Sequence, residues 1–418
     1  MQHKYSLPLL YSANAISGFA QGISMIAIPW YFSAHSQSAY FNTAYGIATL
    51  LVLVFGLYAG TLVDRYSRKL IFIGINLFCF CLIGSIAMYG QYQKLPPIFI
   101  VLVFIITILN YNIHYPTLYA FGQEISLPEN YGKLNAQIEI VGQSTSILSG
   151  AIAGLLIEGV ESTQEKLFGM NLNLGFSIPK WELHQIFMAD AVTYLIAAAI
   201  IFFIPYQQQF KPNLLQDSIA KQLKAGFQFL KAHPKELLFG LFSYTVFAAL
   251  IVSIHALLPV YINTRLHEDG TVFAASEFLY AIGALVSGML IRLLFPSHRT
   301  EIGVIILTGL AAFLYLSLYV SVNVIWFYLF SILMGICNAG TRILRLTHLF
   351  KHIPNEFMGR VNSIFNMGNV LTRSIFIFCF TLPFFTFDQH IVYAFLSLSI
   401  FLGISTLLLM YHTKSQQA

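Results

Sequence analysis

The sequence contains very little charge. Only 9% of its 418 residues are Asp, Glu, Lys or Arg, whereas a soluble domain typically carries about 25%. From Tyr5 to Ala59 the chain has none of these residues. Hydrophobic residues make up 57% of the chain, and the mean hydropathy is +0.72. Because so few charged side chains are available to cover a water-exposed surface, the composition excludes an ordinary soluble domain and predicts a protein that lies in lipid.

Cysteine is also scarce, and the common catalytic motifs are missing. The four cysteines, Cys79, Cys81, Cys337 and Cys379, all fall within apolar runs, which excludes an external disulfide framework. The sequence contains no HExxH zinc motif, no GxxxxGK[ST] phosphate loop and no close pair of acids within an apolar run. We therefore expect no enzymatic activity, no bound metal, no cofactor and no direct use of ATP.

Long apolar runs are what the chain has in abundance. A membrane-spanning helix needs roughly 20 apolar residues, and unpaired backbone groups are not tolerated in hydrocarbon. The first run is too long for a signal-peptide core and has no small-residue cleavage site after it, so we expect it to be retained. We predict an all-α membrane protein with twelve transmembrane helices, at residues 7–33, 41–63, 68–90, 97–122, 132–157, 186–205, 238–262, 272–294, 301–320, 323–345, 360–386 and 390–411.

The positive charges predict the orientation in the membrane. Most of the 22 lysine and arginine residues lie in the segments that would share one side with the N-terminus. Cytoplasmic loops carry this excess, so both termini are expected in the cytoplasm. We expect a monomeric, multi-pass protein in the lipid bilayer of a plasma membrane, the inner membrane in a bacterium. The net charge of +5 then reflects topology, and nucleic-acid binding is not expected. The acidic outer loop 158–185 receives no role.

The chain repeats itself at a nearly constant spacing. Three segments of the first half recur in the second: Pro29 with Pro259, "GTLVDR" from Gly60 with "GMLIRL" from Gly288, and "GKLN" from Gly132 with "GRVN" from Gly359. A spacing of six helices preserves orientation, so we expect two parallel six-helix repeats, 1–205 and 238–418. Transporters built this way bind substrate between the repeats near the midplane. The joining segment 206–237 has an amphipathic pattern and is expected to hold a helix along the membrane surface.

The segment "GTLVDRYSRK" interrupts the charge-free region. Gly60, Asp64, Arg65, Arg68 and Lys69 match the signature loop of the major facilitator superfamily, although Ser67 stands where the pattern has a second glycine. "FMADAVTYLIAA", "AGFQFLKAHPKELL" and "MGRVNSI" resemble the branch that contains macrolide-efflux proteins and the enterobactin exporter. The resemblance implies the major facilitator fold, secondary export that is commonly coupled to protons, and a conformational latch formed by the loop cluster.

Polar residues form stripes along several predicted helices. Charged residues in a membrane usually face a cavity or a partner, but small polar residues also join helices together, and both explanations stay open. For Arg373 there are two hypotheses, a pair with Glu139 or contact with an anionic group of the substrate. The candidate pathway residues are Asn14, Gln21, Asn110, His114, Glu139, Gln143, His255, Asn366, Asn369 and Arg373; Ser17 and Ser24 continue the first stripe.

Together these features predict a secondary transporter that exports a small amphipathic molecule by alternating access, as an antiporter driven by protons or another ion gradient. A ferroportin-like metal exporter is an alternative that would need converging Asp, His or Cys ligands. A lipid or lysolipid flippase is another, because the aromatic-rich interior suits acyl chains. A non-transporting scaffold or receptor is a third, although it would have little use for polar stripes inside the membrane.

Overall fold

The protein is described here from a computed structural model. It describes residues 5–126, 131–159, 165–167, 170–172, 177–206, 219–296, 299–386 and 390–417. Within these ranges the side chains of some residues, among them residues 56–65 and Glu139, lie outside the description. Almost all described residues are helical, as predicted. Outside the helices the described residues form turns, connecting segments and a short antiparallel pair within the segment 158–185, β1 (Glu165–Leu167) and β2 (Met170–Leu172).

The first half of the chain forms six long helices. Ser67 begins the third by accepting a hydrogen bond from the Leu70 amide at 3.4 Å, and its φ of −57° makes no demand for glycine. The signature turn therefore tolerates its serine, which acts as a helix N-cap. The helices are α1 (Ser6–Ala34), α2 (Ser38–Arg65), α3 (Arg68–Tyr92), α4 (Pro97–Glu124), α5 (Tyr131–Glu158) and α6 (Leu183–Phe202).

The second half is less regular. The stretch predicted as one span at 238–262 lies within a single apolar composite, but its helix is broken at Tyr244, contains one π-helical turn and runs into a second at its end. The stretch predicted at 360–386 ends at Cys379, shortly before Pro383, which cannot continue a hydrogen-bonded helix. The elements are α7 (Ile219–Ala232), α8 (Pro234–Ser243), α9 (Thr245–Val252), η2 (Ser253–Leu257), α10 (Leu258–Tyr261), η3 (Ile262–Leu266), α11 (Gly270–Leu294), α12 (Thr300–Val320), α13 (Val324–His352), α14 (Asn355–Cys379), α15 (Pro383–Thr386) and α16 (Ile391–Gln417).

Many of these helices have the length and apolarity of membrane spans. Ten stretches of the described chain meet both conditions, including the whole composite from Pro234 to Leu266. α1 and α14 are not among them, and these two helices carry predicted polar stripes. Large apolar side chains are exposed along the helices, for example Leu293 and Ile325, as expected for surfaces that face lipid rather than water. The protein is a multi-pass membrane protein; the count of twelve spans and the internal repeat stay predictions.

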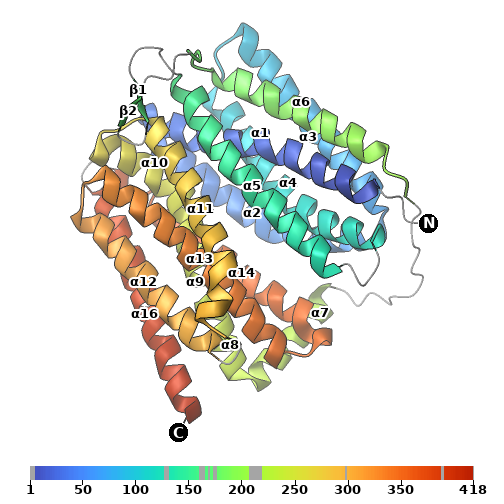
Figure 1. Ribbon diagram of the computed structural model, residues 1–418, viewed down its shortest axis with the longest axis vertical. Helices are drawn as coiled ribbons and strands as arrows, with labels where there is room; N and C mark the ends of the chain where they lie inside the picture. The colour runs from blue at the N-terminus through green and yellow to red at the C-terminus, as the bar shows by residue number, and fades with distance from the viewer. Residues whose placement is uncertain are drawn as a thin grey trace. The chain divides into compact units, whose positions relative to one another are not determined.

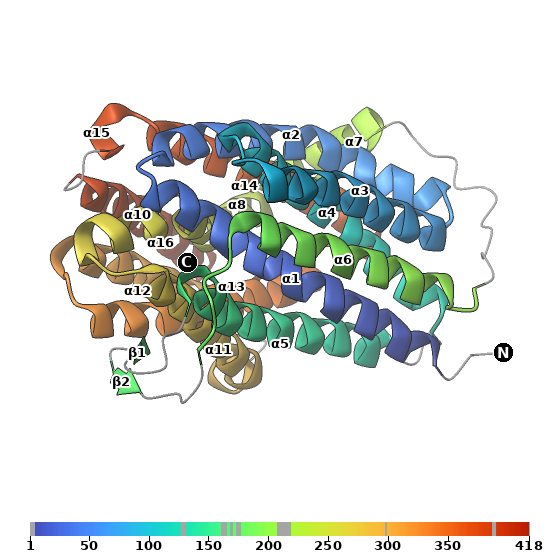
Figure 2. The ribbon, with the colours of Figure 1, turned by 90° about the horizontal axis from the view of Figure 1, so that it is seen from above.

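The helices group into two compact units. Unit 1 comprises residues 1–35, 51–214 and 269–278, and unit 2 comprises residues 36–50, 215–268 and 279–418. In unit 1, α6 packs against both α1 and α3, and Figures 1 and 2 show the three running side by side. In unit 2, α12 packs against α13 and α16. The first part of α2 belongs to unit 2 and the first turns of α11 belong to unit 1, so these two helices each contribute to both units.

Small residues bring some helices into close contact. A Cβ atom at Gly150 of α5 would lie 3.0 Å from the amide nitrogen of Phe278, and one at Gly154 would lie 3.0 Å from the Cβ of Ala274. The GxxxG pair therefore packs directly against the first turns of α11. Close backbone approach through small residues is the usual way in which membrane helices associate. In unit 2, α7 approaches α14 at Gly226, where a Cβ atom would lie 3.0 Å from the Cβ of Arg360.

Candidate substrate pathway

The polar stripes of α1 and α4 meet inside unit 1. His114 lies 2.9 Å from Asn14, with its Nε2 facing the amide oxygen, and both side chains are buried. Because the amide oxygen accepts, Nε2 donates, which leaves Nδ1 as the acceptor of a neutral ring. His114 Nδ1 has no hydrogen-bond partner among the described residues. The two predicted residues therefore form a pair with one unused acceptor.

Asn110 lies one helical turn from His114 on α4, and Gln21 lies two turns from Asn14 on α1, on the same helix faces. Asn110 Nδ2 donates to the Tyr194 hydroxyl of α6 at 3.3 Å. Its Oδ1, like Nε2 of the buried Gln21, has no partner among the described residues. A buried polar atom without a partner costs roughly 1–3 kcal/mol, and in native proteins such atoms usually serve water, an ion or a ligand. The inside of unit 1 is thus polar and incompletely satisfied.

Asp190 is a pathway candidate that was not among the pathway residues predicted from the sequence. This α6 carboxylate is fully buried, and its Oδ2 accepts a hydrogen bond from the Ser24 hydroxyl at 2.9 Å. Its Oδ1 has no partner among the described residues. Ser24 continues the α1 stripe that begins at Asn14, so the signal for this site was the face of α1. Nothing in the α6 sequence shows which residue that face meets.

The irregular helix of unit 2 carries His255 in its first π-helical turn. A π turn displaces backbone carbonyls from their α-helical partners, and such turns are frequent at functional sites. Here two side chains of α2 donate to nearby carbonyls: the Tyr45 hydroxyl to Ile251 and Asn42 Nδ2 to Ala256, each at 3.4 Å. The Tyr45 ring also meets the His255 imidazole edge to face, with centroids 5.5 Å apart.

Arg373 of α14 belongs to the same part of unit 2. Its guanidinium carbon lies 5.8 Å from the centre of the Phe247 ring, within the range of a cation–π contact. Tyr45 and His255 are near enough to interact with it electrostatically. Among the described side chains it forms no ion pair with a carboxylate, and its Nε has no hydrogen-bond partner. The Glu139 side chain lies outside the description, so the predicted pair stays a prediction.

The other α14 residues surround the helix break. Asn369 Nδ2 donates to the Tyr244 carbonyl at 3.2 Å, and Asn362 accepts from the Tyr244 hydroxyl at 2.8 Å. Arg345 of α13 lies 3.5 Å from the Tyr244 ring centre and donates to the Ser243 carbonyl. These contacts satisfy backbone and side-chain groups that the break exposes, as irregular membrane helices require. Asn369 therefore supports the break.

Two predicted pathway residues are less buried. Asn366 lies on the exposed side of α14, and Gln143 of α5 is half-buried. Their place in the pathway remains a prediction.

The signature loop is described only for its last two cations. Arg68 forms an ion pair with Glu124 at 2.8 Å and donates to the Ala120 carbonyl, while Lys69 donates to the Phe202 and Ile204 carbonyls. These two cations join α3 to the ends of α4 and α6, where cations favour exposed helix carbonyls. The environments of Gly60, Asp64 and Arg65 lie outside the described residues, so the latch stays a prediction.

Tyr206 completes the Arg68 cluster. Its hydroxyl donates to Glu124 Oε2 at 2.5 Å. Burial and the nearby Glu124 carboxylate raise the pKa of Tyr206, because both disfavour a phenolate. The phenol therefore remains a hydrogen-bond donor at neutral pH, and Glu124 stays the acceptor of both Tyr206 and Arg68.

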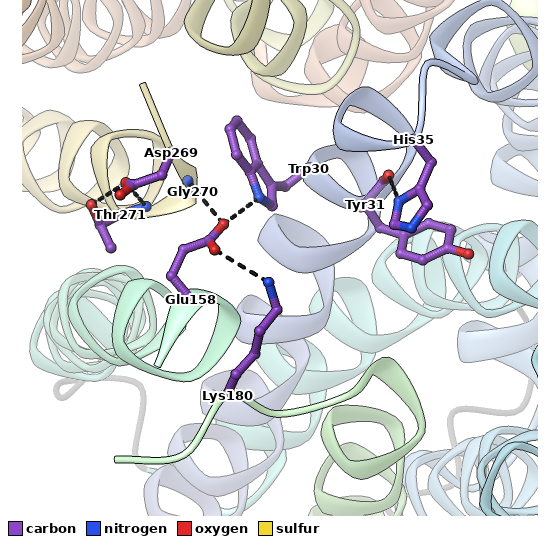
Figure 3. A network of polar contacts seen from close by, with 8 residues as sticks. All are labelled: Trp30, Tyr31, His35, Glu158, Lys180, Asp269, Gly270 and Thr271. Carbon is purple, nitrogen blue, oxygen red and sulfur yellow. Dashed lines mark hydrogen bonds and ion pairs between the residues drawn. The ribbon is translucent and has the colours of Figure 1, made fainter. Parts of the chain in front are cut away.

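A second polar network, the Glu158 clamp, consists of Glu158, Trp30, Lys180 and Gly270 in unit 1. Glu158 Oε1 accepts from Trp30 Nε1 at 2.9 Å and from the Gly270 amide at 3.2 Å, and Lys180 lies 3.2 Å from Oε2 (Figure 3). A Cβ atom at Gly270 would lie 2.7 Å from Trp30 Nε1. The carboxylate of α5 thus binds the positive N-terminal end of α11.

A cavity of about 660 Å³ adjoins the clamp. Its lining mixes aromatic and polar groups, including Tyr31 and His35 of α1, whose rings stack at 4.1 Å (Figure 3). Glu158, Lys180 and Trp181 form another part of the wall. The size and the lining match those of small-molecule sites.

Comparison with known proteins agrees with this architecture. The Major Facilitator Superfamily model matches residues 10–377. Macrolide efflux protein A of Streptococcus pyogenes is 24% identical over 378 residues, which cover 88% of this chain and 85% of that protein. Macrolide efflux protein A of Enterococcus faecalis is 24% identical over 333 residues, covering 77% and 93% respectively.

Solved structures share the fold at low identity. A mutant of the nucleoside transporter NupG has a TM-score of 0.73 at 15% identity, covering 97% of this chain and 99% of that one. An inward-facing bacterial homologue of the iron transporter ferroportin has a TM-score of 0.68 at 13% identity, covering 97% and 98%. These likenesses show the fold alone, because one fold hosts many substrates. The family and its structural neighbours are transporters rather than enzymes, and this chain belongs to the major facilitator superfamily of transporters.

Proposed function

We propose that the protein is a secondary exporter of a small amphipathic molecule, acting by alternating access in a bacterial inner membrane with both termini in the cytoplasm. The observation that carries the proposal is a buried or half-buried polar cluster in each unit that has unused hydrogen-bonding atoms, around His114 in unit 1 and Arg373 in unit 2. The macrolide-efflux relatives support the efflux direction and an amphipathic, drug-like substrate.

The surroundings of Arg373 suggest part of the substrate chemistry. A cation beside Phe247 and Tyr45 favours a ligand that has a hydrogen-bond acceptor or an acidic group next to an apolar body. Because no carboxylate neutralises it among the described side chains, the guanidinium is available to such a group. Drug-like and siderophore-like molecules both have this character, so both belong in the first substrate panel.

The Glu158 clamp is a candidate for a gate that opens and closes during alternating access. It joins α1 and α5 of the first six predicted helices to the start of α11, which belongs to the second six. We propose that the clamp closes the outer side and opens once per cycle. Its bonds are modest, each worth about 1 kcal/mol net, so opening needs only the differential binding energy of a substrate or proton.

Two carboxylates are candidates for proton coupling. Glu139 is the candidate from the sequence. Asp190 is the candidate from geometry, because a fully buried carboxylate with one hydrogen bond and one unused oxygen suits a group that gains and loses a proton. Cys79 of α3, Tyr111 of α4 and Tyr194 of α6 lie within electrostatic range of Asp190, and none of them is a cation.

Transport by the purified protein in proteoliposomes tests the proposal. A labelled macrolide and a labelled siderophore-like anion are offered from the side that carries the protein's termini, with and without a pH gradient. Accumulation that requires the gradient and is removed by dissipating it is the expected result. If every substrate only equilibrates across the membrane, with or without the pH gradient, proton-coupled export is ruled out. If the protein moves a fluorescent lysolipid between the leaflets faster than it transports either solute, the flippase is favoured.

A further inference from the structure

Three side chains that the transport pathway does not use gather at one end of unit 2. Glu236 lies in the first turn of α8, and His348 and His352 lie one turn apart near the end of α13. One potential ligand atom from each lies within 4.8 Å of the other two. The two imidazoles are stacked, with centroids 4.1 Å apart. Imidazole and carboxylate are common ligands of Zn²⁺.

The Nδ1 atom of each histidine faces an oxygen atom other than the proposed ligand atoms. His352 Nδ1 lies 2.9 Å from the His348 carbonyl, to which it donates, and His348 Nδ1 lies 3.6 Å from Glu301 Oε1 of α12. Metal-binding histidines usually donate their second ring nitrogen to a carbonyl or a carboxylate in this way, which fixes the tautomer. The remaining nitrogen of each ring, Nε2, is then the one available to a metal.

The distances and burial suit a metal ion. His348 Nε2 lies 3.2 Å from Glu236 Oε2, and two ligand atoms on tetrahedral Zn²⁺ are about 3.3 Å apart when the metal bonds have ordinary lengths. His348 is buried, with 3% of its side chain exposed, whereas His352 is exposed. The first ligand is therefore fixed by packing, and the other gives an ion access from water.

An ion pair is the competing explanation. A protonated His348 between Glu236 and Glu301 would satisfy the same two contacts without a metal. That explanation does not account for the position of His352, because the ion pair between His348 and the two carboxylates does not need a second, exposed imidazole one turn away. The stacking and the engaged Nδ1 of His352 are instead what a second imidazole ligand requires.

We propose that Glu236, His348 and His352 bind one Zn²⁺ ion, with Glu301 orienting His348. The bound ion links the start of α8 to the end of α13, on the side predicted to be cytoplasmic. It lies at the end of the stretch that is broken at Tyr244, and Arg345 of α13 contacts that break one turn before His348. Zn²⁺ at this site stabilises unit 2 and acts as a regulator rather than as transported cargo.

Zinc binding to the full-length, tag-free protein in detergent tests the site. The Zn²⁺ affinity is measured by competition with a fluorescent chelator, and the visible absorption of bound Co²⁺ reports the ligand geometry. We expect one high-affinity equivalent and a tetrahedral Co²⁺ spectrum. His352→Ala and Glu236→Gln should each weaken affinity by at least ~10-fold, and Glu301→Gln by roughly 10-fold or more through His348.

His35→Ala is the matched control. His35 is also exposed, and its Nδ1 also contacts the carbonyl four residues earlier, at 2.8 Å, but it lies in unit 1. Its replacement should leave the affinity unchanged. Absence of saturable Zn²⁺ binding in the wild type overturns the proposal, as does equal affinity in wild type, His352→Ala and Glu236→Gln. Because His352 is exposed, its variant is expected to fold, and a normal size-exclusion profile verifies this.

Discussion

Asp190 of α6 accepts a hydrogen bond from Ser24 of α1 at 2.9 Å, and neither side chain has measurable contact with solvent. The pair joins the two helices that pack most centrally in unit 1. An ionised carboxylate with a single neutral donor is poorly compensated in such a place. This relationship, which links residues far apart in the sequence, is the basis of the first prediction.

We predict that Asp190→Asn abolishes gradient-driven accumulation but preserves substrate exchange. Asparagine keeps an oxygen for the Ser24 hydroxyl and removes only the ability to carry a proton. Accumulation and counterflow in proteoliposomes separate the two activities. Glu139→Gln is measured in parallel, because loss of accumulation in that variant alone would make Asp190 structural and Glu139 the coupling group.

We predict that Arg373→Ala weakens substrate binding by about tenfold or more, equivalent to about 1.4 kcal/mol, and that Arg373→Lys is intermediate. Lysine keeps the charge but loses the planar fork of donors. Equilibrium binding of labelled substrate to purified protein provides the measurement. Arg360→Ala is the matched control, since Arg360 lies on the same helix at 5.6 Å from the Phe357 ring.

A double variant separates the two hypotheses for Arg373. If Glu139→Gln restores the binding or transport that Arg373→Ala has lost, the two residues form a pair in the working protein. If it restores nothing, direct recognition of the substrate is favoured. Unchanged affinity and transport in Arg373→Ala would eliminate both.

The Glu158 clamp should control opening near the start of α11. Glu158→Ala removes the hydrogen bonds to Trp30 and to the Gly270 amide, about 2 kcal/mol in total, and also the more exposed ion pair with Lys180. The two hydrogen bonds alone correspond to a roughly 30-fold shift toward the open state. The measurement is the modification rate of a cysteine placed at the buried Ala274 by an impermeant maleimide, in a background without the four native cysteines. Gly270→Ala should act similarly, because its Cβ would collide with Trp30 and Glu158.

Asp269→Asn is the control for the clamp. Asp269 caps the same end of α11 by accepting from the Thr271 amide at 2.9 Å, and its carboxylate is not one of the groups that bind Glu158 or Trp30 in Figure 3. Its variant should leave the labelling rate near the wild-type value. Equal labelling of the Glu158→Ala variant and the wild type would show that the clamp does not limit opening.

Two variants of the signature loop should separate an effect on protein stability from an effect on the transport cycle. Arg68→Ala removes a charged hydrogen bond and leaves Glu124 with Tyr206, so we predict a loss of about 1.5–3 kcal/mol in stability. Asp64→Asn should instead fold normally and transport poorly. Thermal stability in detergent and transport per folded molecule are measured for both. Normal transport by a well-expressed Asp64→Asn protein would refute the latch.

The sequence could predict the helices and the family because these depend on local chemistry. A long apolar run in lipid has one way to satisfy its backbone, so α3 or α12 follows from composition alone. The loop from Gly60 to Lys69 can likewise be recognised from the sequence, because its residues form one contiguous motif. The α1 stripe correctly marked Asn14 and Gln21 as buried, because helical spacing fixes which residues share a face.

The tertiary structure decided which of those faces meet and where a helix departs from regularity. Carbonyls in and next to the π turn that contains His255 accept hydrogen bonds from Tyr45 and Asn42 of a helix far away in the sequence, and no local sequence pattern predicts this turn. The pairs Ser24–Asp190 and Glu236–His348 join residues that only packing brings together. The spacing of residues in the sequence determines which face of one helix they share. A site also needs several helices to be aligned and rotated correctly relative to one another, and side-chain packing across the whole unit sets that arrangement.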